Sequence, residues 1–499
     1  MFLGIDVGTF ESKGVLVERD GTVVAEARRR HGISTPAPGH VEQDPETVWW
    51  ADVAAIAREL TAHPVAREID SVGISAIGPC VVATDADLNP LRPGILYGVD
   101  GRATAQIDRL TARLGTDEIL RRTGNELSSQ SAGPKIAWVA DEEPDIWGAA
   151  RWFMTSQSYL VARLTGEVTI DHATAGYFHP LYDLENGVWD TTGCEDFIEP
   201  ERLPRLGWST DLAGTVTGRA AAETGIPEGT PVIIGTTDAP AEAVGSGVVS
   251  EGDLMAMYGS SGYFIRVGDR VRFDDRLWTA PFVFEGTSVL AAGTSTAGTA
   301  TRWVADLLAL TDADDGVTFA RLVELADRSE PGARGVLALP HFAGERTPFR
   351  DPLSRGALIG LGLEHTPSDV ARAVLEGVGH SIAAALAVYA DTEADAPIGR
   401  VVAIGGATRN PFIIGTVSTI IDREQEIADT AGAALGDAFL AAVGIGAVTR
   451  TDEIRGWVAV RDTVRPDPAS RARLQADHID YIALYEALSD LQHRRAQTA

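Results

Sequence analysis

The stretch Gly4-Ile5-Asp6-Val7-Gly8-Thr9-Phe10-Glu11-Ser12-Lys13-Gly14 has the pattern of two strands joined by a tight turn. An apolar run over residues 2–6 leads into the Gly-Thr turn, and a second β-rich run follows over residues 14–18. Asp20-Gly21 is a hairpin signal, after which a third run returns over residues 23–27. The first 27 residues therefore predict three strands, with a glycine turn between the first two.

A similar pattern recurs in the second half of the chain. A strand over residues 254–258 leads into a Gly/Ser turn at 259–262, and a returning strand follows at 263–267. A long helix is expected from Thr366-Pro367, and a further strand over residues 401–404 ends in glycines. Two such cycles predict an α/β protein of two domains with a cleft between them. We place these domains at residues 1–248 and 249–499.

The composition suits two large globular cores and excludes several classes of protein. The chain has 499 residues, of which 44% are hydrophobic. Its net charge of −29 disfavours unspecific binding to nucleic acid or to an anionic membrane. No stretch approaches 18 uninterrupted apolar residues, and the first residues lack the basic region of a secretory signal. Cys80 and Cys194 have no metal-ligand spacing, which favours free thiols in a reducing cytoplasm.

The glycine turn after Asp6 has the chemistry of a phosphate site. Backbone N–H groups of such a turn can bind phosphate oxygens, and Lys13 is long enough to reach terminal phosphates. Asp6 ends the first strand and offers the oxygen ligands that hydrated Mg²⁺ prefers. A plain hairpin with a surface lysine has the same pattern, so both interpretations stay open.

Two further acidic positions are candidates for contact with a hydroxylated ligand. Asp238 follows a buried-strand pattern and precedes small residues, so its carboxylate could accept a proton from a substrate hydroxyl. An aspartate before Ala-Pro-Ala is also a good helix N-cap. Asp100 and Arg102 could bracket a polyhydroxylated ligand, although an ion pair at a helix start is the commoner case.

Glycine turns in the second half suggest contacts to a nucleotide. Gly259 and Ser260 belong to a second candidate phosphate turn, for which a simple hairpin loop is the alternative. Gly405 and Gly406 would let the backbone come close to a flat base, and Asn410 could hydrogen-bond that base. A strand-to-helix turn capped by Asn410 is the alternative there.

Each of these signals is weak alone, but their order and spacing resemble the FGGY carbohydrate kinases over about residues 1–450. Residues 134–142, Pro-Lys-Ile-Ala-Trp-Val-Ala-Asp-Glu, are similar to the second half of one family signature. Residues 356–361, followed after seven residues by 369–376, are similar to a second signature throughout. The resemblance implies the two-domain actin-like ATPase fold (ribonuclease H-like), with ATP and sugar bound in a central cleft and Mg²⁺ required.

The resemblance also implies roles for individual residues. It assigns Asp238 as the catalytic base, Asp6 to the metal, and Thr9, Ser12 and Lys13 to the phosphates. It assigns the remaining nucleotide contacts to Gly259, Ser260, Gly298, Gly405, Gly406 and Asn410.

Within the family, several stretches resemble pentulose kinases and xylulokinases in particular. These stretches are residues 41–45 with Trp49-Trp50, residues 91–96, and residues 344–348. The chain departs from xylulokinases at residues 76–79 and at Gly98-Val99. The wall of the sugar site that includes Ile77 and Gly78 is therefore expected to differ from that of xylulokinases. Asp100 and Arg102 are expected to keep general contacts with the sugar.

The expected activity is phosphorylation of a terminal hydroxyl of a ketopentose by ATP. Ribulose, erythritol, threitol or a pentitol are alternative substrates, and a non-catalytic ATP-binding sugar sensor is an alternative function. A homodimer is the default expectation from symmetry statistics.

Overall fold

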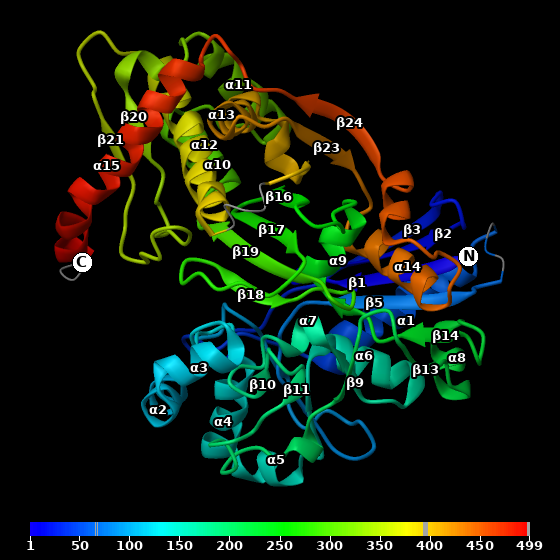
Figure 1. Cartoon of the computed structure of the whole chain (residues 1–499). Helices are drawn as coiled ribbons and strands as arrows, with labels where there is room; N and C mark the ends of the chain where they lie inside the picture. Colours follow the sequence, from blue (N-terminus) through cyan, green and yellow to red (C-terminus); the bar gives the residue numbers. More distant parts are fainter. Residues whose placement is uncertain (65, 67, 393–397, 497–499) are drawn as a thin grey trace.

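The computed structural model describes residues 1–64, 66, 68–392 and 398–496. Within this part of the chain, two large sheets of seven strands each dominate the fold (Figure 1). The first sheet has the order β13-β14-β5-β1-β2-β3, with β15 beside β5. Its strands are β1 (Phe2–Val7), β2 (Glu11–Val17), β3 (Val23–Arg30), β5 (Ser71–Ala76), β13 (Leu212–Thr215), β14 (Pro231–Ile233) and β15 (Thr236–Thr237).

The second sheet repeats the topology of the first. Its order is β18-β19-β17-β16-β22-β23-β24. In the first sheet β3, β2 and β1 are antiparallel neighbours, and β5 and β14 continue parallel to β1. In the second sheet β19, β17 and β16 are antiparallel neighbours, and β22 and β23 continue parallel to β16. The strands are β16 (Leu254–Tyr258), β17 (Gly262–Gly268), β18 (Trp278–Pro281), β19 (Ser288–Thr294), β22 (Val401–Ile404), β23 (Gln425–Asp429) and β24 (Ala459–Val464).

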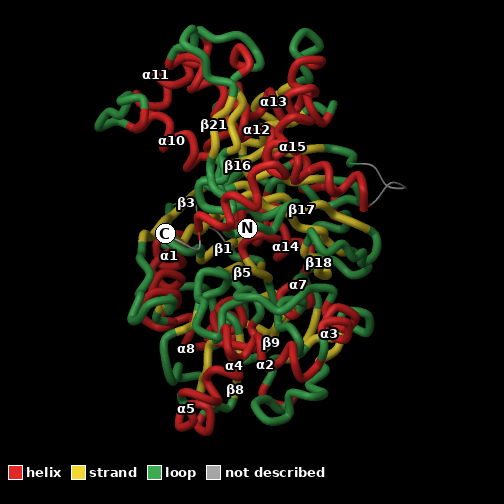
Figure 2. The backbone as a smooth tube through the Cα atoms, turned by 90° about the vertical axis from the view of Figure 1, so that its left-hand side faces the viewer, coloured by secondary structure: helices red, strands yellow, loops and turns green. Residues whose placement is uncertain are grey.

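Helices and short strand pairs surround the two sheets. In both views, α10–α13 lie at one end of the molecule and α2–α5 at the other, with the sheets between them (Figures 1 and 2). A π-helical turn, Pro45–Trp50, precedes α1. The helices are α1 (Ala51–Thr61), α2 (Thr104–Leu114), α3 (Thr116–Thr123), α4 (Ala132–Glu142), α5 (Pro144–Ala149), α6 (Ser156–Thr165), α7 (His172–Ala175), α8 (Gly218–Thr224), α9 (Asp238–Gly245), α10 (Gly298–Leu307), α11 (Asp315–Asp327), α12 (Pro367–Thr392), α13 (Pro411–Ile421), α14 (Ala433–Gly444) and α15 (Arg471–Ala496). The paired short strands are β4 (Glu42–Gln43) with β7 (Gly94–Ile95), β6 (Val82–Thr84) with β8 (Trp152–Met154), β9 (Thr169–Asp171) with β12 (Arg205–Gly207), β10 (Tyr182–Asp183) with β11 (Val188–Trp189), and β20 (Leu337–Leu339) with β21 (Ala357–Ile359).

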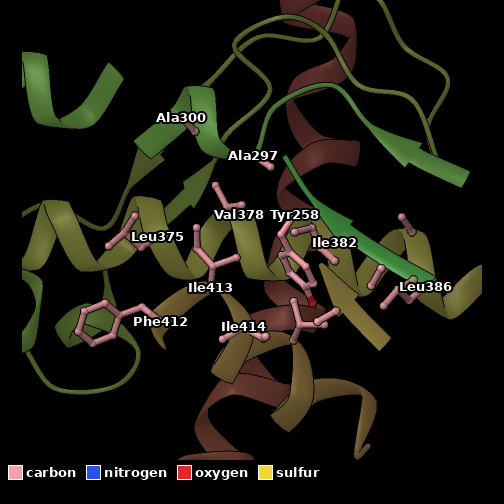
Figure 3. Close-up of a cluster of buried hydrophobic side chains, with 14 of the residues drawn as sticks. Tyr258, Ala297, Ala300, Leu375, Val378, Ile382, Leu386, Phe412, Ile413 and Ile414 are labelled. Atoms are coloured by element: carbon pink, nitrogen blue, oxygen red, sulfur yellow. The ribbon is translucent and has the colours of Figure 1, made fainter. Parts of the chain in front are cut away.

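The core of the second half forms around α12. Figure 3 shows Val378 and Ile382 of α12 beside Ile413 and Ile414 of α13, with Tyr258 of β16 against them. By length and composition α12 could cross a membrane, but 89% of its most apolar window is buried inside the protein. Its apolar surface is therefore used for packing against the second sheet and its neighbouring helices.

Glycines allow α14 to join the two halves of the chain. Although α14 comes from the C-terminal half, it packs on β1 and β5 of the first sheet. A Cβ atom on Gly4 would lie 1.9 Å from the carbonyl oxygen of Ala434, and one on Gly73 would lie 2.2 Å from that of Asp437. Similarly, a Cβ on Gly436 would lie 2.0 Å from the carbonyl oxygen of Ala241 in α9. This close packing holds the start of α9 at the junction of the two sheets.

Candidate active site

A cavity of about 370 Å³ opens where the ends of both sheets meet. Its volume lies in the usual range for small-molecule sites. The first half contributes polar groups at the ends of β1, β5 and β15, and the second half contributes the walls of β17, β18 and β19. The lining residues with polar side chains are Asp6, Tyr97, Gln130, Tyr177, Thr237, Asp238, Glu242, Ser261, Tyr263 and Arg346.

Asp6 lies at the end of β1 and shares a hydroxyl with a second carboxylate. The Ser75 hydroxyl on the neighbouring strand β5 lies 3.1 Å from Asp6 Oδ1 and 2.7 Å from Asp437 Oδ2. Because one hydroxyl hydrogen serves one acceptor at a time, one of the two carboxyls lacks this donor, and a proton or a cation there would offset the repulsion between them. Burial raises the pKa of Asp6 well above its usual value, and repulsion from Asp238 and Glu242 adds to the rise.

Asp238 is the first residue of α9 and faces the cavity. Thr237 occupies the N-cap position, so the structure does not make Asp238 the cap, one of the two roles that its sequence allows. Asp238 Oδ1 accepts the Ala239 N–H at 2.9 Å, which fixes the carboxylate at the helix start. Burial raises the pKa of Asp238 to about 7 against the lowering effect of this hydrogen bond, and the Glu242 carboxylate adds to the rise. A carboxyl with such a pKa is suited to accept a proton near neutral pH.

The candidate phosphate residues Thr9, Ser12 and Lys13 are not among the residues that line the cavity, although Gly8 of the same turn is. The turn closes through a hydrogen bond from the Gly8 N–H to the Glu11 carbonyl. Thr9 is half-buried, and its carbonyl accepts the Gln43 amide. The Ser12 hydroxyl points inward and donates to Asp52 at 2.8 Å. Lys13 pairs with Asp6 in the β1–β2 register, and its Nζ lies 3.5 Å from Glu26.

The nucleotide candidates of the second half gather around one turn. The N–H of Gly298, at the start of α10, donates to the Gly259 carbonyl at 2.9 Å, and the Ala297 N–H donates to the Ser260 carbonyl. Gly405 has a φ of 93°, and a Cβ there would lie 2.6 Å from the Tyr258 carbonyl oxygen. A Cβ on Gly406 would meet nothing within 4 Å, so this backbone faces open space.

Asn410 acts as the cap of α13. Its side-chain oxygen accepts the N–H groups of Phe412 and Ile413, while its Nδ2 is buried without a partner among the described residues. The side chain is fully buried. In this structure it therefore has the capping role that the sequence left open as an alternative.

Of the two residues predicted for the altered wall of the sugar site, one lines the cavity and the other lies in the core. Gly78 lines the cavity, and a Cβ there would lie 2.5 Å from Thr237, the residue before Asp238. Ile77 is fully buried and is not among the lining residues. Ile77 belongs to the hydrophobic core of the first half, and its contact with a substrate stays a prediction.

Asp100 and Arg102 also lie outside the lining of the cavity. Arg102 donates to Asp100 and, at 2.7 Å, to Glu42, and its guanidinium lies 4.8 Å from the centre of the Trp138 ring. Asp100 accepts the Val41 N–H at 2.6 Å. These bonds hold both side chains in a buried network that supports the neighbouring loop, and the sugar contacts of the pair stay a prediction.

Several lining residues did not come from sequence reasoning. Tyr97, Gln130, Glu242 and Tyr263 belong to four separate segments, none of which carries a motif for them. Arg346 lies in the stretch 344–348 that carried part of the family resemblance, which is the one signal that could have identified it.

Two family models match the chain. The N-terminal domain of the FGGY family of carbohydrate kinases matches residues 1–245, and the C-terminal domain of the same family matches residues 254–445. The chain belongs to the FGGY family of carbohydrate kinases. The two-domain actin-like ATPase fold that its sequence implied is confirmed by the solved structures that it resembles.

Named relatives of this FGGY kinase differ in substrate. It is 30% identical to a xylulose kinase of Bacillus subtilis, over 89% of this chain and 88% of that protein. It is 27% identical to a gluconokinase of Bacillus subtilis, over 94% of this chain and 93% of that protein. A crystal structure of a xylulose kinase from Rhodospirillum rubrum matches with a TM-score of 0.91 and 31% identity, over 99% of both chains. The family assignment therefore establishes a carbohydrate kinase and leaves its sugar open.

The acidic end of the cavity suits a magnesium ion that arrives with ATP. Among the described residues, no three His, Cys, Asp or Glu side chains are arranged to hold a metal ion. Mg²⁺ commonly uses one or two carboxylates together with waters and phosphate oxygens, so Asp6 is sufficient as a protein ligand. Burial raises the pKa of Asp6, Asp238 and Glu242. Repulsion from neighbouring carboxylates adds to the rise for Asp6 and Asp238, and a bound cation would relieve that repulsion.

Proposed function

We propose that this FGGY kinase transfers the terminal phosphoryl group of ATP to a terminal hydroxyl of a ketopentose, as a xylulokinase does. The observation that carries the proposal is Asp238, a cavity-lining carboxylate with a pKa of about 7, between the first glycine turn and the wall of the second sheet. The xylulose kinase relatives support the choice of a ketopentose. The reaction would take place in the cytoplasm, in keeping with the buried free thiols of Cys80 and Cys194.

In the proposed mechanism, Asp238 accepts the proton of the substrate hydroxyl. The hydroxyl oxygen then forms a bond to the terminal phosphorus, and the bond from that phosphorus to the ADP oxygen breaks. The N–H groups of the Gly8 and Gly259 turns and the ammonium group of Lys13 bind the phosphate oxygens. Asp6 would hold Mg²⁺, which supplies neutralising charge when it is bound. The walls of the cavity exclude water from the reacting groups.

Two further predictions concern the domain boundary and the oligomeric state of the protein. The first is that the chain has two domains, residues 1–248 and 249–499, whose boundary lies in the segment between α9 and β16. Helix α14 of the second domain packs on the sheet of the first. A homodimer stays a prediction from symmetry alone.

A substrate panel tests the proposed activity. ADP release with MgATP is measured for D-xylulose, D-ribulose, L-ribulose, L-xylulose, erythritol, threitol, the pentitols, glycerol and D-gluconate. We expect one ketopentose to give the highest kcat/KM. A better polyol or sugar acid would replace the proposed substrate, and ATP binding with no turnover on any compound would favour a sensor.

The pKa of Asp238 predicts a pH dependence. Because a raised pKa keeps the carboxyl protonated and inactive below about pH 7, kcat/KM should rise tenfold per pH unit in acid and level off above about pH 7. The measurement is kcat/KM for the best sugar from pH 5 to 9. Constant kcat/KM down to pH 5 would contradict the role of Asp238 as a base with this pKa.

Lys13→Ala should raise the KM for ATP by about 10-fold or more and change the KM for the sugar less, since a charged hydrogen bond to phosphate would be lost. Arg28→Ala is the matched control, because Arg28 pairs with Lys13 in the β2–β3 register but is half exposed and bonds to Glu11 and Glu26. A larger effect on the sugar KM would remove Lys13 from the ATP site.

A further inference from the structure

Lys135 brings a buried ammonium group to two loops beside the cavity. It lies in the first turn of α4, and only 1% of its surface is exposed. Its Nζ donates to the carbonyl oxygen of Leu96 at 2.7 Å and to that of Ser129 at 2.6 Å. Among the described residues, these two carbonyls are its hydrogen-bond acceptors, and no carboxylate forms an ion pair with it. The ammonium group therefore joins two stretches of backbone.

Each of these carbonyls belongs to the residue just before one that lines the cavity. Leu96 precedes Tyr97, Ser129 precedes Gln130, and both Tyr97 and Gln130 line the cavity. The two loops are also in direct contact, because the Ser129 hydroxyl donates to the Gly98 carbonyl at 2.8 Å. A Cβ on Gly98 would lie 2.6 Å from the Gln130 Nε2. The ammonium group thus fixes the backbone beside two side chains that form one part of the cavity wall.

The start of α4 is itself fixed to a third segment of the cavity. The Ala132 N–H donates to the Tyr177 carbonyl at 3.1 Å, and the Gly133 N–H donates to the His179 carbonyl at 3.1 Å. A Cβ on Gly133 would lie 2.4 Å from the His179 carbonyl oxygen, so the helix and this segment are in close contact. Tyr177 also lines the cavity. The side chain of Lys135 therefore extends from a helix end that is held in place.

A buried ammonium group is a costly way to join two loops. Removal of a charge from water costs free energy that two neutral carbonyls offset only in part. Burial accordingly lowers the pKa of Lys135 to about 8. Lysine is also rare in this chain, since Lys13 and Lys135 are its only lysines and the rest of its 42 basic residues are arginines. The composition would place arginine here, so the position requires a compact group whose three donors do not share a plane.

Tyr97 and Gln130 share their cavity with Asp238. All three line it, whereas the nucleotide candidates Gly298 and Gly405 do not. A sugar whose hydroxyl reaches Asp238 would therefore occupy the same space as these two side chains. The nucleotide would have its other contacts outside this space.

We propose that Lys135 is a positioning residue of the sugar site, which holds the two loops that carry Tyr97 and Gln130. The inference rests on the proposed function and adds to it a residue that does not touch the substrate. Without the ammonium group, both carbonyls would lose their shared donor and the two side chains would be held less firmly against the sugar. The affinity for ATP would change little.

Lys135→Met tests this role, because methionine keeps an unbranched stem and removes the charge. The KM values are measured with MgATP and D-xylulose, or with the sugar of the panel that replaces D-xylulose. We expect the sugar KM to rise by about 10-fold or more, while the KM for ATP stays within about twofold of the wild-type value. Hydrogen–deuterium exchange of the free protein should be faster at residues 96–100 and 128–131. Lys135→Arg keeps a buried cation of different shape and should show the same pattern with a smaller rise in the sugar KM.

Arg202→Met is the matched control. Arg202 is also a buried cation that donates to two backbone carbonyls, those of Trp147 and Ala150, but it does not line the cavity. We expect the melting temperature to fall in both methionine variants, while both KM values of Arg202→Met stay within about twofold of the wild-type values.

Three results would overturn the proposal: a wild-type sugar KM in the Lys135 variants, an equal rise of both KM values, or unchanged exchange in the two loops. Absence of ADP release from the wild-type protein with every sugar of the panel is a different result. It would overturn the proposed function, and the role of Lys135 toward a sugar with it.

Discussion

Replacement of Asp238 by asparagine should lower kcat by about 10²- to 10⁴-fold. Asparagine keeps the shape of the side chain and can still accept the Ala239 N–H, so α9 should keep its start. It cannot accept a proton from a substrate hydroxyl at neutral pH. The loss should therefore appear in kcat, while the KM for ATP changes little.

The control for this variant is Asp315→Asn. Asp315 is also the first residue of its helix, α11, but it is exposed and pairs with Arg302. Its kcat should stay within twofold of the wild-type value. A kcat of Asp238→Asn near that of the wild-type enzyme would remove Asp238 from the catalytic role.

Replacement of Gly4 by alanine should destabilise the protein by about 3 kcal/mol, at the upper end of the usual cost of overpacking. The new Cβ would lie 1.9 Å from the Ala434 carbonyl oxygen and 2.6 Å from the Ala438 nitrogen. Both atoms belong to the backbone of α14, so no side-chain rotation can relieve the clash. The helix must move away from β1, and its contact with α9 would loosen as well.

Urea denaturation of Gly4→Ala measures this effect. Gly148→Ala is the control, because Gly148 is an exposed residue of α5 whose added Cβ would meet nothing within 4 Å. Alanine at that helical position should be neutral or slightly stabilising. A free energy of unfolding for Gly4→Ala within 1 kcal/mol of the wild-type value would mean that α14 does not pack on β1 as the structure has it.

Local patterns in the sequence were sufficient to predict the positions of the strands that lead to the site. The predicted strands at residues 2–6 and 254–258 correspond to β1 and β16. A short apolar run that ends in a glycine turn can be recognised as a buried strand from neighbouring residues alone. The segment before α1 does not follow such a simple pattern. Asp44 caps the π-helical turn Pro45–Trp50, and this turn changes the phase of the apolar face, so that Val53, Ile56 and Ala57 are buried in α1.

The candidate site was predictable only where a motif ends a strand. Asp6 lies near the end of β1, Gly78 and Asp238 follow β5 and β15 of the same sheet, and the structure brings all three to one cavity. Arg346 and Tyr97 reach the same cavity from loops in different halves of the chain, which only the folded topology can bring together. Asp100 and Arg102 form a buried ion pair in this structure, and their contacts with a sugar stay a prediction, because such a pair and a pair of ligand-binding side chains look alike in sequence.

The most direct test of the account is product analysis of wild-type protein with MgATP and the best sugar of the panel. We predict equal amounts of ADP and of a sugar phosphate bearing the new group on a terminal hydroxyl, with both products reduced at least 100-fold in Asp238→Asn. ADP without sugar phosphate, or sugar phosphate formed equally well by Asp238→Asn, would contradict the assignment of this cavity as the kinase site.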